Sequence, residues 1–306
     1  MELPKHHIPI QKIDTINGVE IFIKREDQTH REISGNKYWK LFYNVKNYLA
    51  KSVSQPMLIT FGGAYSNHIS AVASLGRDLG IPTIGIIRGE ELQDKWQENY
   101  TLMKAYQDGM SFRFVSREAY RDKNTLSKVL LEEFPKALII PEGGTNPLAV
   151  EGIQHMLSNE TKTFDYLCTA VGTGGTLAGI SKFADPYQKI LGFKVVNDTS
   201  IYETIVELSG KENFQLFEAH DGKYGKISDE NIHFLNTFFE KYHIPADPIY
   251  VGKMLRKLFS LVEEGFFPEK TRVLAFHTGG LQGIIGANHY LAERGKTLLK
   301  IDVERL

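Results

Sequence analysis

The chain has 306 residues, 42% of them hydrophobic and 24% charged, which is typical of a globular protein with room for two α/β domains. Its 36 basic and 37 acidic residues give a net charge of −1, which argues against a nucleic-acid or membrane surface as partner. One cysteine, Cys168, excludes an intrachain disulfide and a cysteine-rich zinc site. Because no signal-peptide pattern and no membrane-length apolar run is found, we expect a cytoplasmic protein.

The first predicted elements surround Lys37. A strand is expected over 19–23, and apolar residues at helical spacing predict a helix over 38–49. Ser34 or Asn36 can cap that helix through a side-chain oxygen. The positive potential at a helix N-terminus makes the Lys37 ammonium easier to deprotonate, as an imine-forming lysine requires. The alternative interpretation is an ordinary surface lysine.

Short apolar runs then alternate with amphipathic segments as far as residue 140. Strands are expected over 57–61, 83–87, 112–115 and 137–140, and helices over 66–79, 96–106 and 124–134. Strands this apolar are buried on both faces, which indicates a parallel sheet covered by helices. Glycines and prolines at 141–147 break the pattern and mark a crossing between domains.

A second alternating series follows this break. Strands are expected over 166–171, 191–196 and 272–276, and helices over 176–183, 229–242 and 253–264. This sheet has too few strands unless 19–23 joins it. The predicted fold is therefore α/β with two domains, each a mostly parallel sheet flanked by helices. Residues 1–51 and 146–306 form the large domain and 52–145 a small inserted one, with ligands bound beyond the carboxyl ends of the strands.

Three glycine-bearing loops follow strands and open helices, at 61–68, 171–179 and 277–280. Free N–H groups at such helix starts favour an anion. The second loop resembles a dinucleotide-binding turn with Asp198 on the ribose, but Leu177 stands where the third glycine of G-x-G-x-x-G belongs. One phosphate held by backbone N–H groups and the Thr173 and Thr176 hydroxyls fits better. No residues stand at metal-ligand spacing, so no metal is predicted.

Six motifs in this order resemble the pyridoxal-phosphate enzymes of the tryptophan-synthase-β fold type, and within them 1-aminocyclopropane-1-carboxylate (ACC) deaminase and D-cysteine desulfhydrase. The motifs are Lys24-Arg25-Glu26-Asp27, Gly35-Asn36-Lys37 with Lys40, Gly62-Gly63 leading to Ser66-Asn67, Thr173-Gly174-Gly175-Thr176, Asp247-Pro248-Ile249-Tyr250 with Gly252-Lys253, and His277-Thr278-Gly279-Gly280. The similarity runs from about residue 20 to 285. It implies pyridoxal 5′-phosphate as cofactor, a small amino acid as substrate and a homodimer.

The resemblance also implies roles for individual residues. Lys37 links covalently to the cofactor, and Asn67 contacts its ring oxygen. The implied cofactor-binding residues are Lys37, Lys40, Asn67, Gly172, Thr173, Gly174, Gly175, Thr176 and Thr278. The implied substrate site comprises Ser66, Asn67, His68, Tyr224 and Tyr250, and the implied catalytic residues are Lys37, Ser66, Tyr224 and Tyr250. From the sequence alone, Ser66 is equally well explained as a helix cap.

Two positions bear on the substrate. ACC deaminases carry a glutamate, placed at the cofactor's pyridine nitrogen, where this chain has Val251. Thr278 agrees with D-cysteine desulfhydrases, although the segment 281–284 lacks the proline pattern of both groups. The expected activity is therefore D-cysteine desulfuration to pyruvate, sulfide and ammonia, ahead of ACC deamination to 2-oxobutyrate and ammonia. Two other classes stay open: a nicotinamide-linked oxidoreductase using the loop 172–179, and a cofactor-binding protein without turnover.

Overall fold

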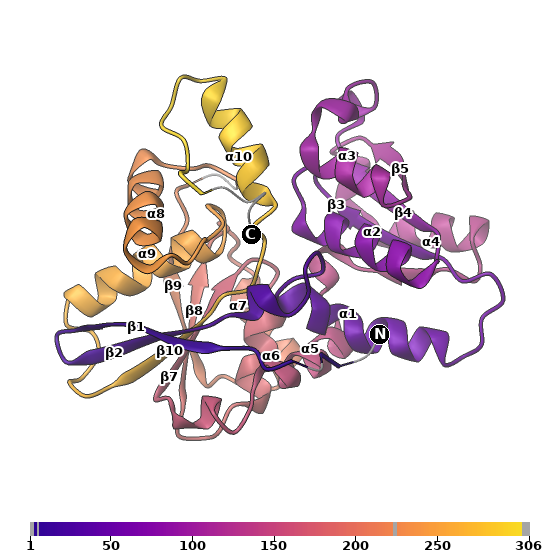
Figure 1. Ribbon diagram of the computed structural model, residues 1–306. Coiled ribbons are helices and arrows are strands. Elements are labelled where there is room, and N and C mark those ends of the chain that lie inside the picture. The colour runs from indigo at the N-terminus through magenta and orange to yellow at the C-terminus, as the bar shows by residue number, and fades with distance from the viewer. Residues whose placement is uncertain (1–2, 5, 223–224, 302–306) are drawn as a thin grey trace.

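The computed structural model describes residues 3–4, 6–222 and 225–301, and the strands in this part of the chain form two separate sheets (Figure 1). The larger sheet has six strands in the order β1 (Ile10–Ile16), β2 (Val19–Lys24), β10 (Arg272–Phe276), β7 (Tyr166–Val171), β8 (Lys189–Lys194) and β9 (Phe214–Glu218). The smaller has four, in the order β5 (Met110–Val115), β4 (Thr83–Arg88), β3 (Leu58–Gly62) and β6 (Leu138–Ile140). Every pair of neighbours is parallel except β1 and β2.

Helices flank both sheets. They are α1 (Asn36–Leu49), α2 (Asn67–Leu79), α3 (Tyr100–Gln107), α4 (Lys123–Glu133), α5 (Pro147–Ile153), α6 (Gly175–Phe183), α7 (Ile201–Ser209), α8 (Asp229–Tyr242), α9 (Val251–Glu263) and α10 (Gly283–Ala292). In Figure 1, α2, α3 and α4 lie with the four-stranded sheet, α8 and α9 lie on the other side of the molecule, and α10 lies between them and approaches α3. Among the described helices, none combines the length and the apolar character needed to cross a membrane.

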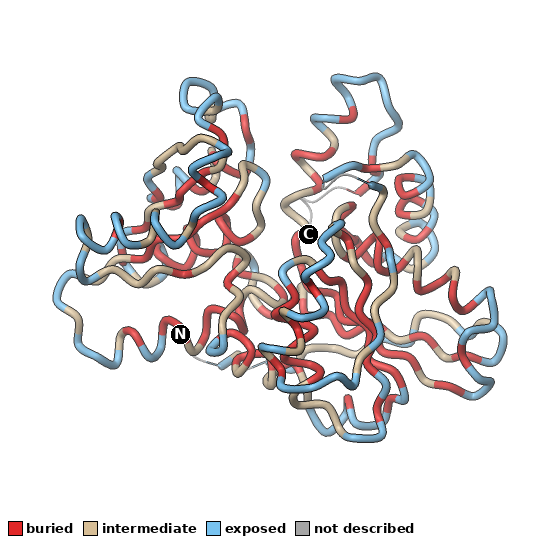
Figure 2. Tube along the Cα trace, turned by 180° about the vertical axis from the view of Figure 1, so that it is seen from behind, coloured by how far each residue is buried: buried red, intermediate tan, exposed pale blue. Residues whose placement is uncertain are grey.

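Strand β7 shows why the larger sheet is covered on both faces. Leu167 and Val171 belong to one apolar cluster, which includes residues of α1, α5 and α6. Tyr166, Cys168 and Ala170 alternate with them and belong to a second cluster with residues of α8 and α9. This period of two, with both sets buried, is the mark of a central parallel strand. Figure 2 shows buried residues running along the strands of both sheets.

The predicted fold class, α/β with two mostly parallel sheets flanked by helices, is confirmed. The strand expected over 19–23 does join the larger sheet, where β2 lies between β1 and β10. The predicted limits 52 and 145 fall outside the first and last strands of the four-stranded sheet. The division into two domains at these limits stays a prediction.

Several element boundaries differ from expectation. Helix α1 begins at Asn36, and its N-cap is Gly35. No side chain caps this helix, so the predicted cap by Ser34 or Asn36 is wrong. The Asn36 amide instead donates to the Thr176 hydroxyl, 2.8 Å away. The helix expected over 96–106 is divided into a 3-10 turn at 96–98 and α3. The strand expected over 191–196 spans 189–194.

The chain passes between the two sheets through one pair of helices. Helix α1 leads from the larger sheet toward β3, and α5 leads back from β6 toward β7. The two helices pack so closely that a Cβ on Gly152 would overlap the carbonyl oxygen of Trp39. A larger residue at 152 would therefore separate the two crossings.

Candidate active site

The candidate site lies where the three central parallel strands of the larger sheet end. Strands β2, β10 and β7 run in the same direction, with Phe276 opposite Lys24, so the loops that follow them emerge at one edge. These loops border a cavity of about 900 Å³ that is also lined by residues of the four-stranded sheet. The cavity is lined by Lys37, Lys40, Ser66, Asn67, His68, Gly172, Thr173, Gly174, Gly175, Thr176, Tyr250 and Thr278. Tyr224 lies outside the described residues.

Lys37 occupies the first turn of α1. Gly35, the residue immediately before α1, has φ of 66°. It packs so closely against the Thr278 carbonyl that a Cβ on Gly35 would overlap the carbonyl oxygen. The Lys37 amine lies in the cavity wall, and partial burial by the surrounding protein lowers its pKa to about 8, opposed by the negative charge of Asp247. The amine donates to Asn36 Oδ1 at 3.4 Å. The lowered pKa that the sequence suggested is present, with burial as its largest cause.

The glycine loop before α6 provides a setting for an anion. The helix N-cap is Gly174, with φ of 80°, and no side chain caps the helix. A Cβ on Gly175 would lie only 2.9 Å from the Thr145 hydroxyl oxygen, so there is no room for a side chain at residue 175. Lys40 lies behind the loop and donates to Thr145 Oγ1 at 2.7 Å, with Thr173 Oγ1 at 3.5 Å. Uncapped N–H groups backed by a buried lysine suit a phosphate.

The start of α2 presents two further polar groups to the cavity. Ser66 Oγ accepts from the N–H groups of His68 and Ile69, so this serine caps the helix while its own hydroxyl hydrogen can still be donated. Asn67 Oδ1 accepts from Gln282 at 2.8 Å, which turns the Asn67 amide nitrogen into the available donor. Gln282 is a site residue that the sequence analysis missed.

His68 is a buried, neutral member of the cavity wall. Its Nε2 lies 2.8 Å from the Thr60 hydroxyl. Burial, followed by the charges of Lys37 and Lys40, lowers the pKa of His68 well below its usual value. A neutral imidazole adds no charge beside the two lysines.

Asp247 is a second residue whose role the sequence analysis missed. Its buried carboxylate accepts the N–H groups of Ile249, Tyr250 and Val251 at 2.7–2.9 Å and so caps α9. Burial raises its pKa, while these three bonds lower it. The cap fixes Tyr250, whose Cε1 would lie 3.0 Å from a Cβ on Gly172. The sequence analysis identified the motif that contains Asp247, but not the effect of the Asp247 charge on Lys37.

The two positions that bear on the substrate differ in their surroundings. Thr278 lines the cavity. Val251 is fully buried in the apolar cluster that packs between α8, α9 and the larger sheet. Among the described residues that line the cavity, Val251 does not appear. A hydroxyl therefore borders the cavity, and the position of the deaminase glutamate is apolar.

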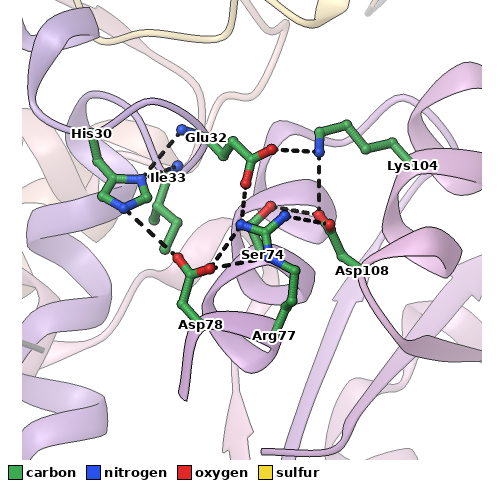
Figure 3. A network of polar contacts seen from close by, with 8 residues as sticks. All are labelled: His30, Glu32, Ile33, Ser74, Arg77, Asp78, Lys104 and Asp108. Carbon is green, nitrogen blue, oxygen red and sulfur yellow. Dashed lines mark hydrogen bonds and ion pairs between the residues drawn. The ribbon is translucent and has the colours of Figure 1, made fainter. Parts of the chain in front are cut away.

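Glu32 ties the loop before Lys37 to the helices of the smaller sheet (Figure 3). This cavity-lining carboxylate accepts from Arg77 of α2, and from Lys104 of α3 at 2.8 Å. Asp108 completes the cluster by accepting from Arg77 at 2.6 Å. The bond from Arg77 is the main cause that lowers the Glu32 pKa to about 2.

These features fit an aldehyde cofactor that carries a phosphate. An amine of lowered pKa in the cavity wall can form an imine, and an uncapped helix start borders the same cavity. The two-sheet fold and this site define a pyridoxal-phosphate enzyme of fold type II.

Comparison with known proteins gives the family. The model of the family "Pyridoxal-phosphate dependent enzyme" matches residues 4–279, so the chain belongs to this family. This membership removes the nicotinamide-linked alternative, in agreement with Leu177, which is fully buried in the core. The cofactor is pyridoxal phosphate.

Two relatives and one crystal structure show which enzymes of this family the chain is similar to. The chain is 29% identical to the bifunctional D-cysteine desulfhydrase/1-aminocyclopropane-1-carboxylate deaminase of Arabidopsis thaliana, over 88% of this chain and 74% of that protein. It is 24% identical to the D-cysteine desulfhydrase of Yersinia enterocolitica, over 92% and 93% of the two chains. A crystal structure of an ACC deaminase homologue superimposes with a TM-score of 0.75 at 28% identity, over 92% of each chain.

Proposed function

We propose that this protein is a pyridoxal-phosphate lyase that converts D-cysteine, or a close D-amino-acid analogue, to pyruvate, sulfide and ammonia. The observation that carries the proposal is the Thr278 hydroxyl on the cavity wall, with Val251 in the apolar core. A hydroxyl can bond an unprotonated pyridine nitrogen, whereas a carboxylate would keep that nitrogen protonated. Elimination of a thiol from the β carbon needs less electron withdrawal than opening a cyclopropane ring.

Besides Thr278, four groups would hold the cofactor. Lys37 would bind it covalently, and the backbone N–H groups of 173–176 would bind its phosphate, with Lys40 as the cation behind them. The Asn67 amide nitrogen would donate to the ring oxygen, because Gln282 already occupies its carbonyl. When bound, pyridoxal phosphate supplies an electron sink for a bond that breaks at the substrate's α carbon.

The protein's own groups would orient the substrate and move its protons. The α2 N-terminus and the Ser66 hydroxyl would bind the carboxylate. Lys37, with a pKa of about 8, would take the α proton. The carbon–sulfur bond breaks with its electron pair on sulfur, and the Tyr250 phenol would protonate the departing thiolate. One water then completes the balance to pyruvate, hydrogen sulfide and ammonia. Tyr224 is proposed for the same task from the resemblance alone.

ACC deamination is the second candidate. It is favoured by the names of the Arabidopsis relative and of the similar crystal structure. Both reactions would use Lys37, Ser66 and Tyr250, so these residues do not separate the two.

The decisive experiment offers the holoenzyme D- and L-amino acids and ACC, and measures pyruvate, 2-oxobutyrate, ammonia and sulfide. We expect sulfide and pyruvate from D-cysteine, little 2-oxobutyrate from ACC, and no product with Lys37→Ala. Ring opening of ACC that is more efficient than D-cysteine cleavage would reverse the assignment.

We also propose that the protein is a cytoplasmic homodimer that acts on a free amino acid, without a nucleic-acid or membrane partner. The nearly balanced charge supports a small-molecule substrate. The one cysteine, Cys168, is buried, and burial raises the pKa of its thiol, which suits a reducing compartment.

A further inference from the structure

Arg88 is a cation in the cavity wall without an acidic partner. It ends β4, and its side chain is half-buried and lines the cavity. Five described arginines are buried or half-buried, namely Arg25, Arg88, Arg113, Arg256 and Arg272. Four of them form ion pairs with carboxylates, and Arg88 forms none within the described part of the chain. An unpaired guanidinium that faces a cavity is available to bind an anionic group of a ligand.

The packing around Arg88 holds its guanidinium toward the substrate loop. Its Cζ lies 5.6 Å from the Tyr120 ring centroid. Its Nη2 lies 3.6 Å from where a Cβ on Gly63 would stand, and the Gly63 carbonyl accepts from the Ser66 N–H. Arg88 is therefore in contact with the loop that carries Ser66.

Neighbouring charges do not neutralise Arg88. Lys123 stands 4.6 Å from the same Tyr120 ring, and Glu142 pairs with Lys123 at 3.2 Å. Glu32, also in the cavity wall, is bound by Arg77 and Lys104. This side of the cavity therefore keeps one uncompensated positive charge.

The two other anionic groups, one on the cofactor and one on the substrate, have expected sites elsewhere in the cavity. The cofactor phosphate is expected at the start of α6, on the larger sheet, and the substrate carboxylate at the start of α2. Arg88 comes from a third element, β4, next to the α2 site. A guanidinium is well suited to bind carboxylate, sulfonate or phosphate in a bidentate manner.

We propose that Arg88 is a specificity residue that binds an acidic group on the β-substituent of the substrate. The proposal rests on the proposed function, because it assumes an amino acid bound through the cofactor at this site. It extends the substrate class from D-cysteine to D-amino acids whose side chain ends in a carboxylate, sulfonate or phosphate.

The test uses a matched pair of ligands, O-phospho-D-serine and D-serine, with the holoenzyme. Binding is followed by the change in cofactor absorbance, which does not require turnover. We expect the wild type to bind the phosphorylated ligand at least ten-fold more tightly. Arg88→Met should abolish this preference and leave the affinity for D-serine unchanged, whereas Arg88→Lys should keep part of it. Arg121→Met, an exposed arginine outside the cavity wall, serves as the control.

The preference should also weaken as ionic strength rises, because it depends on charge. If Arg88→Met lost affinity for both ligands equally, or lost affinity for neither, the proposal would be overturned. If Arg88→Met does not fold, an unchanged preference in Arg88→Gln would overturn it equally. Failure to cleave D-cysteine, with an Arg88-dependent preference intact, would refute the proposed reaction and leave this inference standing.

Discussion

Lys37 has to lose a proton before it can bind the cofactor, and its pKa of about 8 sets the pH at which this occurs. Below that pH the free-amine fraction falls about ten-fold per unit, so cofactor attachment to the apoenzyme should slow accordingly. Stopped-flow absorbance between pH 6 and pH 9 would follow this rate. Borohydride reduction and peptide mapping should then place the adduct on Lys37, and an adduct on Lys40 would contradict the assignment.

Thr278 should matter through its hydroxyl alone. We expect Thr278→Val, which keeps the shape of the side chain, to lower kcat for D-cysteine about 10- to 100-fold, because the ring nitrogen loses its partner. Thr278→Ser should keep most of the activity. The position of the cofactor absorbance band, measured for all three proteins, reports on the ring nitrogen independently of turnover. Full activity in the valine variant would show that another group bonds this nitrogen.

The loop that precedes α1 depends on the absence of a side chain at residue 35. A Cβ on Gly35 would overlap the Thr278 carbonyl, and φ of 66° with ψ of −145° is accessible almost only to glycine. We expect Gly35→Ala to lower the free energy of unfolding by about 2–4 kcal/mol and to weaken cofactor binding.

Gly80 provides the matched control for that variant. Its φ is 65°, and a Cβ added there would meet nothing within 4 Å. Gly80→Ala should therefore cost only about 1 kcal/mol and leave the cofactor bound. Chemical denaturation and cofactor titration of both variants measure the difference. Equal effects in the two variants would show that the contact with Thr278 is unimportant.

The loop around Glu32 and the helices α2 and α3 are joined by a pH-dependent cluster. Glu32 has a pKa of about 2 in the folded protein, against about 4.3 for an unperturbed glutamate. A lowered carboxyl pKa stabilises the folded state above the unfolded value, and this stability is lost as the pH falls through that window. We expect a loss of about 2 kcal/mol between pH 5 and pH 2, after allowance for solvent screening.

Glu32→Gln should flatten this part of the stability curve. Denaturant titrations at several pH values would compare it with the wild type. Glu133→Gln removes a carboxylate that pairs with Arg113 on the surface and should change the curve much less. An identical pH dependence in wild type and Glu32→Gln would show that other carboxylates control the acid response.

For the whole molecule we expect a dimer. Light scattering of the purified holoenzyme should give a mass of twice the 34.7 kDa of one chain. A mass of one chain at micromolar concentration, with full activity, would contradict the homodimer that the family resemblance suggests.

The interior of the fold could be predicted from the sequence, and its edges could not. The central strands are continuous apolar runs, which can be recognised in a sequence without any alternation of polar and apolar residues. Strands β1 and β9 lie at the two edges of the larger sheet and are only partly buried, so polar residues interrupt them. The three glycine loops of the site were found because each follows a strand. Gln282, Asp247 and Arg88 were missed because their roles depend on contacts between distant segments.

Both passages of the chain between the sheets run through α1 and α5, where Gly152 touches the Trp39 carbonyl. Because these two connections run side by side, we expect a rotation about them to be the easiest motion between the two sheets. Lys37 lies in the first turn of α1 itself, and Ser66 lies beyond β3, at the start of α2. We expect a substrate that contacts both residues to draw the two sheets together by its own binding energy, and product departure to release them.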